Sequence, residues 1–314
     1  MDLTNKSTAI MVKKFLTYCI KKKRIVCPDI FIGTGTVVLL LAITLLFALA
    51  IWWLNHNPLL QDFWKDFPAD HKTVEMFSEK IEMNKPVRHP VNVFSGIIYL
   101  IVAIIIFKES QKELKNSDPY SQNKKNRIHK IFFAFILLYV FFGSTFYHAS
   151  LIKLALKIDY SAVYFFSLFP VMYFSCRWLL TKNEEQLRFS KKEITVVVYL
   201  IYITVCLLLS FFTPRGKEQI VSFVCILMFF SFAIASILAN PKKTNINYLI
   251  FSVVCAMIAF IWFELDTHKI LYNANSYFQL HSFWNLFIGL SGFYFYIFIR
   301  SEHLGNSGTE EKLK

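Results

Sequence analysis

Two short groups of polar residues stand out in a strongly apolar chain. The first contains Ser144, His148 and Asp159, and the second contains His281 and Asn285. Side chains of these types are costly in hydrocarbon, so within a membrane they mark function by default. Imidazole nitrogens and carboxylate oxygens bind zinc, and a zinc ion with an open position can activate a water molecule. The residue types therefore predict a metal site inside a membrane.

Helical spacing would bring the members of each group onto one face. Ser144 and His148 are four residues apart, as are His281 and Asn285, and residues at i and i+4 lie on the same side of a helix. Two histidines at this spacing can reach one zinc ion, but here the second position holds an asparagine, which is a poor zinc ligand. We therefore expect two imidazoles, with water or Asp159 completing the coordination.

Each of these residues also has an ordinary structural interpretation. A single histidine at a helix end is more often an interfacial residue than a ligand. Asp159 can face the headgroup region, and Ser144 can bond the carbonyl four residues before it. Glu264 and Asp266 are expected to face water at the end of a span. The metal site gains weight only from the combination of residues.

Composition identifies the class of protein that must position these groups. The chain has 314 residues, only 18% of which are charged, and a mean hydropathy of +0.45. Apolar runs long enough to cross a bilayer recur along it. They are too long for strands, and lipid-exposed backbone must be satisfied internally, so we predict an all-α polytopic transmembrane bundle. The six cysteines include no CxxC pair and are interpreted as packing residues, without a disulfide framework or thiolate metal cluster.

We expect eight transmembrane spans and two polar ends. The spans are 31–54, 91–107, 129–148, 158–180, 194–213, 219–239, 247–265 and 280–300. The first is interpreted as a retained N-terminal anchor, because the basic segment before it is too long for an ordinary signal peptide. Outside the spans lie a basic N-terminal segment, 1–30, an outer loop, 55–76, and a polar C-terminal tail, 301–314.

The net charge of +13 does not indicate a nucleic-acid partner in this chain. The positive charges gather in a few stretches, which is typical of the cytoplasmic loops of a membrane protein. These stretches are 1–30, 108–130, 177–192 and 242–243. With eight spans they all lie on one side together with both termini, so we expect cytoplasmic termini.

The same topology gives three of the polar residues a common depth. His148 ends a span that runs outward, Asp159 begins the next span, and His281 begins the last one. All three then lie near the outer ends of their helices. A common depth is the minimum condition for one site.

The spacing Ser144-x3-His148-x10-Asp159, with His281 on the last helix, resembles alkaline ceramidases. These belong to a superfamily of intramembrane hydrolases that includes adiponectin receptors. Stretches 77–96 and 265–285 are also similar to the entry to that family's first core helix and to its last-helix motif.

The resemblance covers 77–300. It implies a seven-helix ceramidase-like domain, to which the span at 31–54 is an addition.

The resemblance also implies roles for individual residues. His148 and His281 would bind zinc, Ser144 would hold the reacting carbonyl or its oxyanion, and Asp159 would orient or deprotonate the attacking water. The expected substrate is a membrane lipid such as ceramide, cleaved at its amide bond to a fatty acid and a sphingoid base. Further candidate site residues in the matching stretches are Glu79, Asn92, Ser95, Asp266 and Trp284.

Two departures from the family's pattern matter. The third zinc histidine of the family falls at Asn285, which implies weaker zinc binding than in the family. In some members, acidic residues near the first core helix form a calcium site. Here Arg88 and His89 fall near one of those positions, so we do not expect calcium.

Three functions fit these observations. The first is a zinc-dependent intramembrane hydrolase of ceramide-like lipids. The second is a catalytically inactive relative that acts as a lipid-binding or receptor-like protein, which Asn285 favours. A carrier is disfavoured, because Pro170 and Gly289 are isolated and no paired broken helices are evident. The composition suits a bacterial inner membrane, and no protein partner is inferred.

Overall fold

The computed structural model describes seven parts of the chain: 32–67, 77–116, 123–180, 190–214, 217–239, 246–270 and 273–301. The predicted basic segment 1–30, most of the polar tail 301–314 and part of the loop 55–76 lie outside them. Among the described residues there is no β-strand. The predicted all-α class is confirmed.

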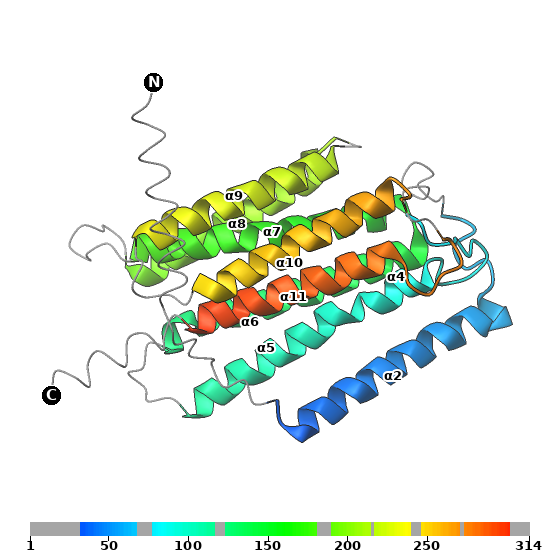
Figure 1. The fold of residues 1–314 in the computed structure, drawn as a ribbon, viewed down its shortest axis with the longest axis horizontal. Helices are drawn as coiled ribbons and strands as arrows, with labels where there is room; N and C mark the ends of the chain where they lie inside the picture. The colour runs from blue at the N-terminus through cyan, green and yellow to red at the C-terminus, as the bar shows by residue number, and fades with distance from the viewer. Residues whose placement is uncertain are drawn as a thin grey trace.

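Long helices run side by side along the molecule (Figure 1). The elements are α2 (Thr34–His56), the 3-10 turn η1 (Pro58–Leu60), α4 (Pro90–Ser95), α5 (Ile97–Asn116), α6 (Asn123–Ser150), α7 (Lys153–Leu180), α8 (Lys191–Phe212), α9 (Glu218–Ala239), α10 (Ile246–Thr267) and α11 (Leu280–Ser301). Among the described residues, seven helices are long and apolar enough to cross a membrane. The remaining predicted span, 219–239, which is the sixth along the chain, forms α9, whose apolar stretch Ile220–Ala235 is shorter. The protein is an integral, multi-pass membrane protein.

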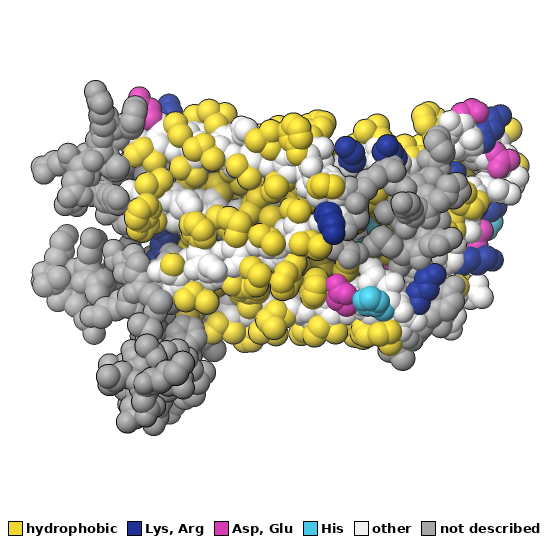
Figure 2. All heavy atoms as spheres, turned by 90° about the horizontal axis from the view of Figure 1, so that it is seen from above, with side chains coloured by type: hydrophobic (Ala, Val, Ile, Leu, Met, Phe, Trp, Pro, Cys, Tyr) yellow, Lys and Arg dark blue, Asp and Glu magenta, His cyan; other side chains and the backbone are white. Residues whose placement is uncertain are grey.

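The surface agrees with this assignment. Figure 2 shows hydrophobic side chains covering the middle of one face, while most of the charged side chains seen there lie toward the ends of the long axis. Large apolar side chains such as Leu41, Phe142 and Phe211 are more than 60% exposed. An exposed apolar belt of this extent fits contact with lipid, not with water.

Aromatic rings fill the centre of the bundle, where α6, α7 and α11 meet. Phe133 stacks on Phe169 with ring centroids 4.6 Å apart and meets Phe295 edge-on at 5.8 Å. Small residues on α11 allow this close packing. A Cβ added at Gly289 would lie 2.6 Å from Ile98, and one at Gly292 would crowd neighbouring rings at about 3.2 Å. Small residues at helix contacts are a common packing device in membranes.

Helix α2 lies at the edge of the bundle (Figure 1). Ile51 is its one buried residue among those described. Its C-terminal end is tied to the loop before α4, because Asn55 and Val87 exchange two hydrogen bonds of 3.0 and 2.9 Å. Phe47 also packs on Phe141 with ring centroids 5.5 Å apart, and Lys108 donates a 3.4 Å hydrogen bond to Thr36. These contacts attach α2 to the bundle, whose core is built by the remaining helices.

A buried ionic network holds α5, α6 and α11 together at the end where α6 begins. Arg300 bonds Glu109 at 3.2 Å and Glu113 at 3.0 Å. Glu113 also pairs with Lys130, which is fully buried. Paired charges are the form in which ionic groups are tolerated away from water.

Candidate active site

A sharp turn between α6 and α7 places the first polar group at one end of the bundle. Leu151 adopts a positive φ of 54° and is fully buried, a conformation that is uncommon for this residue type. Helix α7 therefore starts at once and runs back along α6. Gly143 allows the two helices to approach closely, since a Cβ there would lie 3.3 Å from the Cα of Asp159. Ser144 and Asp159 consequently line the same pocket.

His148 of the first group meets His281 of the second group at this end of the bundle. His148 lies near the end of α6 and His281 near the start of α11. Their Nε2 atoms are 3.1 Å apart, and both side chains are buried. The structure thus brings together two imidazoles that are 133 positions apart in the sequence.

A buried carboxylate faces the other nitrogen of His281. The Asp266 Oδ2 atom lies 3.7 Å from His281 Nδ1, and Ser78 N donates a 3.1 Å hydrogen bond to Asp266 Oδ1. Asp266 is fully buried, so the expectation that it faces water was wrong. It is covered because the loop containing Ser78 lies over the end of α10. A carboxylate in this position favours a proton on Nδ1, which leaves the Nε2 lone pair of His281 free.

A third imidazole, His89, joins the pair. Its Nδ1 atom lies 3.4 Å from His148 Nδ1, and the side chain is fully buried. The ring of Phe77 packs edge-on against His89, His148 and His281, with centroid distances of 6.1, 5.1 and 4.6 Å. From the sequence, His89 was noted only for its place near a calcium position of the family, and its contact with the other histidines was not predicted. The available signal was a histidine directly before Pro90, in the stretch that resembles the family's first core helix.

The two facing Nε2 atoms fit a metal ion such as zinc. Two nitrogens bound 2.0–2.1 Å from a tetrahedral zinc are roughly 3.3 Å apart, and the observed separation is 3.1 Å. Among the described residues, no group of three or more His, Cys, Asp or Glu is arranged to hold a metal ion. The residues thus fit two nitrogen ligands of an open site, in which other ligands must come from water or from a rearranged side chain.

Asn285 has hydrogen-bond partners on both amide atoms. Its Oδ1 accepts a 2.9 Å bond from the Tyr99 hydroxyl, and its Nδ2 donates to Ser95 Oγ at 2.8 Å and to Asn92 O at 3.4 Å. Ser95 Oγ also donates to the Asn92 carbonyl at 2.9 Å. The amide therefore connects α11 to α4 and α5. Asn285 occupies the position of the family's third zinc ligand, and its membership of a metal site stays a prediction.

Glu79 supports the start of α4. Its two carboxylate oxygens accept hydrogen bonds from Val91 N at 2.7 Å and Asn92 N at 2.9 Å. Burial raises the pKa of Glu79 to about 7, against the opposing effect of these two bonds. Burial also lowers the pKa of His89 to about 4, so that imidazole is neutral at pH 7.

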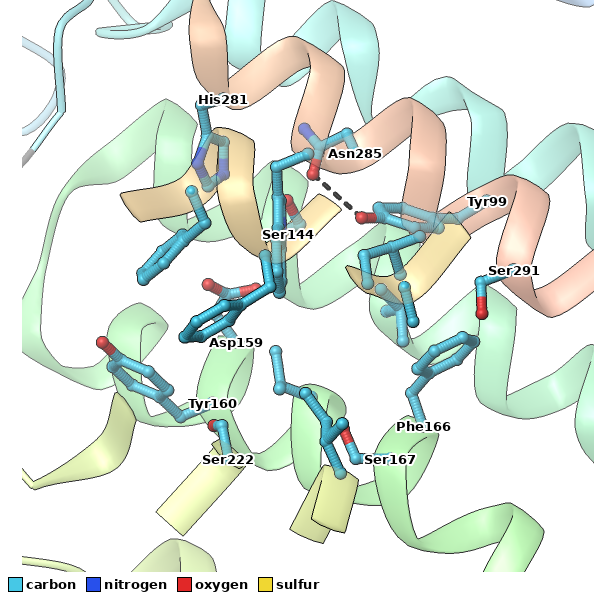
Figure 3. A pocket seen from close by; sticks show the side chains of 18 of the residues that line it. Tyr99, Ser144, Asp159, Tyr160, Phe166, Ser167, Ser222, His281, Asn285 and Ser291 are labelled. Atoms are coloured by element: carbon cyan, nitrogen blue, oxygen red, sulfur yellow. Dashed lines mark hydrogen bonds between the residues drawn. The ribbon is translucent and has the colours of Figure 1, made fainter. Parts of the chain in front are cut away.

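The pocket beside the histidines is polar at one end and apolar beyond it. Ser144, Asp159, His281 and Asn285 line it together with Tyr99, as Figure 3 shows. The lining continues between α6, α7, α9, α10 and α11 with mostly apolar and aromatic residues, among them Phe133, Phe166, Ile226, Phe229, Ile288 and Phe295. Trp284 lines the pocket too and packs on Phe263 at 5.0 Å. This shape suits a molecule with one polar group and a long apolar part.

Comparison with known proteins adds a family assignment to this geometry. A family model described as Ceramidase matches residues 84–314. The matched region contains His89, His148, Asp159 and His281 and leaves out α2. No curated protein and no solved structure matches the chain.

Proposed function

Because the chain belongs to the ceramidase family, we propose that it is a zinc-dependent intramembrane hydrolase that cleaves the amide bond of ceramide-like lipids. The observation that carries the zinc requirement is the 3.1 Å separation of the His148 and His281 Nε2 atoms. The pocket beside them contains Ser144 and Asp159. The hydroxyl can donate a hydrogen bond and the carboxylate can accept a proton, as hydrolysis of an amide requires.

Substrate binding follows from the lining of the pocket. The aromatic and aliphatic side chains between α6, α7, α9, α10 and α11 would hold an acyl chain, because an apolar pocket suits an apolar ligand. The polar end would receive the amide group. The pocket lies between the helices of the bundle, where an acyl chain would be held away from water.

The chemistry divides between the metal and the protein's own groups. Zinc, when bound by His148 and His281, supplies the positive charge that lowers the pKa of water and polarises a carbonyl. The Asp159 carboxylate would accept a proton from the attacking water and return it to the leaving nitrogen as the C–N bond breaks. The Ser144 hydroxyl would donate a hydrogen bond to the carbonyl oxygen as negative charge develops on it. The products are a fatty acid and an amine.

A test is to measure zinc content and fatty-acid release together on the detergent-purified protein. Wild type should hold about one zinc per chain, as expected if the facing imidazoles form a single site, and should release fatty acid from ceramide. His148→Ala should lose both. His268→Ala is the matched control, because His268 is an exposed histidine just after α10 whose Nε2 lies 3.4 Å from Glu264 Oε2, apart from the pocket lining. Hydrolysis that persists in His148→Ala would refute the proposal.

A second candidate is a lipid-binding protein without catalysis. It is favoured by Asn285, which stands where the resemblance places a third zinc histidine and whose amide has three hydrogen-bond partners. The same assay separates the two functions. Saturable ceramide binding without fatty-acid release, in protein supplied with zinc, would support the second function over the first.

We further propose that both termini are cytoplasmic and that the site faces the opposite side. Lys130 and Arg300 lie at the helix ends opposite His148 and His281, on α6 and α11 respectively, and positive charge accumulates on the cytoplasmic side of membrane proteins. Reporter fusions at the two ends of the chain test this. An external C-terminus would reverse the assignment.

A further inference from the structure

We infer that His89 is a positioning residue of the zinc site, which accepts a hydrogen bond from His148 Nδ1 and so directs the His148 Nε2 lone pair toward the metal. The inference rests on the proposed zinc-dependent function and adds to it a residue outside the histidine pair. It starts from the 3.4 Å distance between the Nδ1 atoms of His89 and His148.

The backbone holds His89 in this place. His89 N donates to His148 O at 3.0 Å, and Arg88 N donates to Ala149 O at 3.1 Å. The Arg88 guanidinium also donates a 2.5 Å bond to Ser150 O. Four consecutive positions at the end of α6, 147–150, are buried or half-buried. The loop before α4 is therefore attached firmly to the end of α6, and the two imidazoles are held side by side.

The tautomer of His148 follows from proton counting. A neutral imidazole has one N–H donor and one lone pair. If His148 Nε2 binds a metal, its Nδ1 must carry the proton and needs an acceptor. His89 Nδ1 is the hydrogen-bond partner of that atom in the structure. His89 then carries its own proton on Nε2.

The directions of the rings exclude His89 as a direct ligand in the observed arrangement. His148 faces His281 with Nε2 and His89 with Nδ1, and these two nitrogens point away from each other across the ring. An ion held between His148 and His281 would therefore lie on the far side of His148 from His89. His89 acts through His148, as Asp266 acts through His281.

Among the described contacts, the His89 side chain has no capping role and no further hydrogen bond that would explain its burial. His89 precedes α4 at the N-cap position, but its side chain makes no capping hydrogen bond there. The two free N–H groups at positions 91 and 92 are instead bonded by Glu79. The His89 Nε2 atom is buried and has no hydrogen-bond partner, which is costly for packing alone. A polar group retained at such a cost is typical of a functional site.

The experiment measures zinc affinity of the full-length protein in detergent by competition with a chromophoric chelator. His89→Leu removes the acceptor and should weaken zinc binding by about 10–100-fold, the usual effect of losing a partner of a metal ligand. His89→Asn should retain most of the affinity, because its Oδ1 can occupy the place of the imidazole Nδ1. The visible absorption of the cobalt(II) form should shift in His89→Leu and remain close to wild type in His89→Asn.

The matched control is His129→Leu. His129 is also buried and lies on the same helix as His148, near the start of α6, where its Nδ1 is 2.7 Å from the Tyr199 hydroxyl. Its loss should leave zinc affinity unchanged. If His89→Leu does not fold, His89→Gln replaces it. The Gln amide reaches beyond the position of the imidazole Nδ1, so the His89→Gln protein should bind zinc more weakly than the His89→Asn protein.

The outcomes separate the two proposals. Unchanged zinc affinity in His89→Leu, or equal affinity in the Asn and Gln variants, overturns the role of His89 and leaves the proposed function standing. A wild-type protein that binds no zinc overturns both. Weakened binding in His89→Leu, rescued in His89→Asn and absent from the His129 control, supports the inference.

Discussion

The hydrogen bond between Asn285 and Tyr99 offers a quantitative test of the structure. It joins α11 to α5 at 2.9 Å, and both side chains are buried. Interhelical hydrogen bonds in membrane proteins contribute about 0.6 kcal/mol on average and up to roughly 1.7 kcal/mol. A short bond between buried groups belongs to the upper part of this range. We therefore expect a coupling energy of about 1–1.7 kcal/mol between Asn285→Ala and Tyr99→Phe.

The single variants differ in a way that the structure predicts. Tyr99→Phe removes one hydrogen bond and leaves Ser95 and Asn92 bonded to the amide. Asn285→Ala removes all three bonds and leaves the Tyr99 hydroxyl buried without this partner, which costs roughly 1–3 kcal/mol. Asn285→Ala should therefore destabilise the protein more than Tyr99→Phe.

The assay is the free energy of unfolding in mixed micelles for wild type, both single variants and the double variant. Zinc affinity is measured on the same four proteins. We expect reduced stability without loss of zinc affinity. Strictly additive effects would refute the hydrogen bond, and a large loss of zinc affinity in Asn285→Ala would show instead that this amide belongs to the metal site.

Three further predictions concern catalysis, stability and pH. Ser144→Ala should lower the turnover of ceramide by about 10²–10³-fold, and Asp159→Asn should lower it by about 10²–10⁴-fold. Both variants should retain zinc. Loss of zinc from Asp159→Asn would identify this carboxylate as a ligand instead. Glu113→Gln should destabilise the protein by about 3–5 kcal/mol, since it leaves a buried lysine without its counter-charge; unchanged thermal unfolding would contradict this. Burial raises the pKa of Glu79 from its ordinary 4.5 to about 7, so the unfolded chain releases this proton first and stability should fall as pH rises between these values. Glu79→Gln should flatten that dependence in unfolding measurements, and an unaltered slope would refute the assignment.

Much of the architecture could be predicted from local features of the chain. Apolar runs of sufficient length predict membrane-spanning helices, because backbone groups in lipid must be satisfied within the helix. The predicted span 280–300 is the clearest case, since it coincides almost completely with α11, Leu280–Ser301. The ends of other elements were harder to predict, and α7 begins five residues before its predicted start because the turn at Leu151 is so short.

The partners of individual polar side chains could not be predicted in this way. Asp266 ends an apolar run, a position that usually faces water, yet the loop with Ser78 covers it. His89 lies 59 positions from His148, and its place before Pro90 does not indicate which side chain it contacts. Asn285 lies on the same helix face as His281, but its amide bonds Tyr99 and Ser95.

The sequence by itself determined the all-helical membrane class, the family resemblance and the pairing of Ser144 with His148 on one helix. These follow from hydropathy and from spacing within a single helix, where geometry is set by the backbone alone. Only the tertiary structure decided which nitrogen of each histidine faces which partner. That choice depends on the close approach of separate helices and on the loop attached to the end of α6, and these contacts form only when the whole bundle packs.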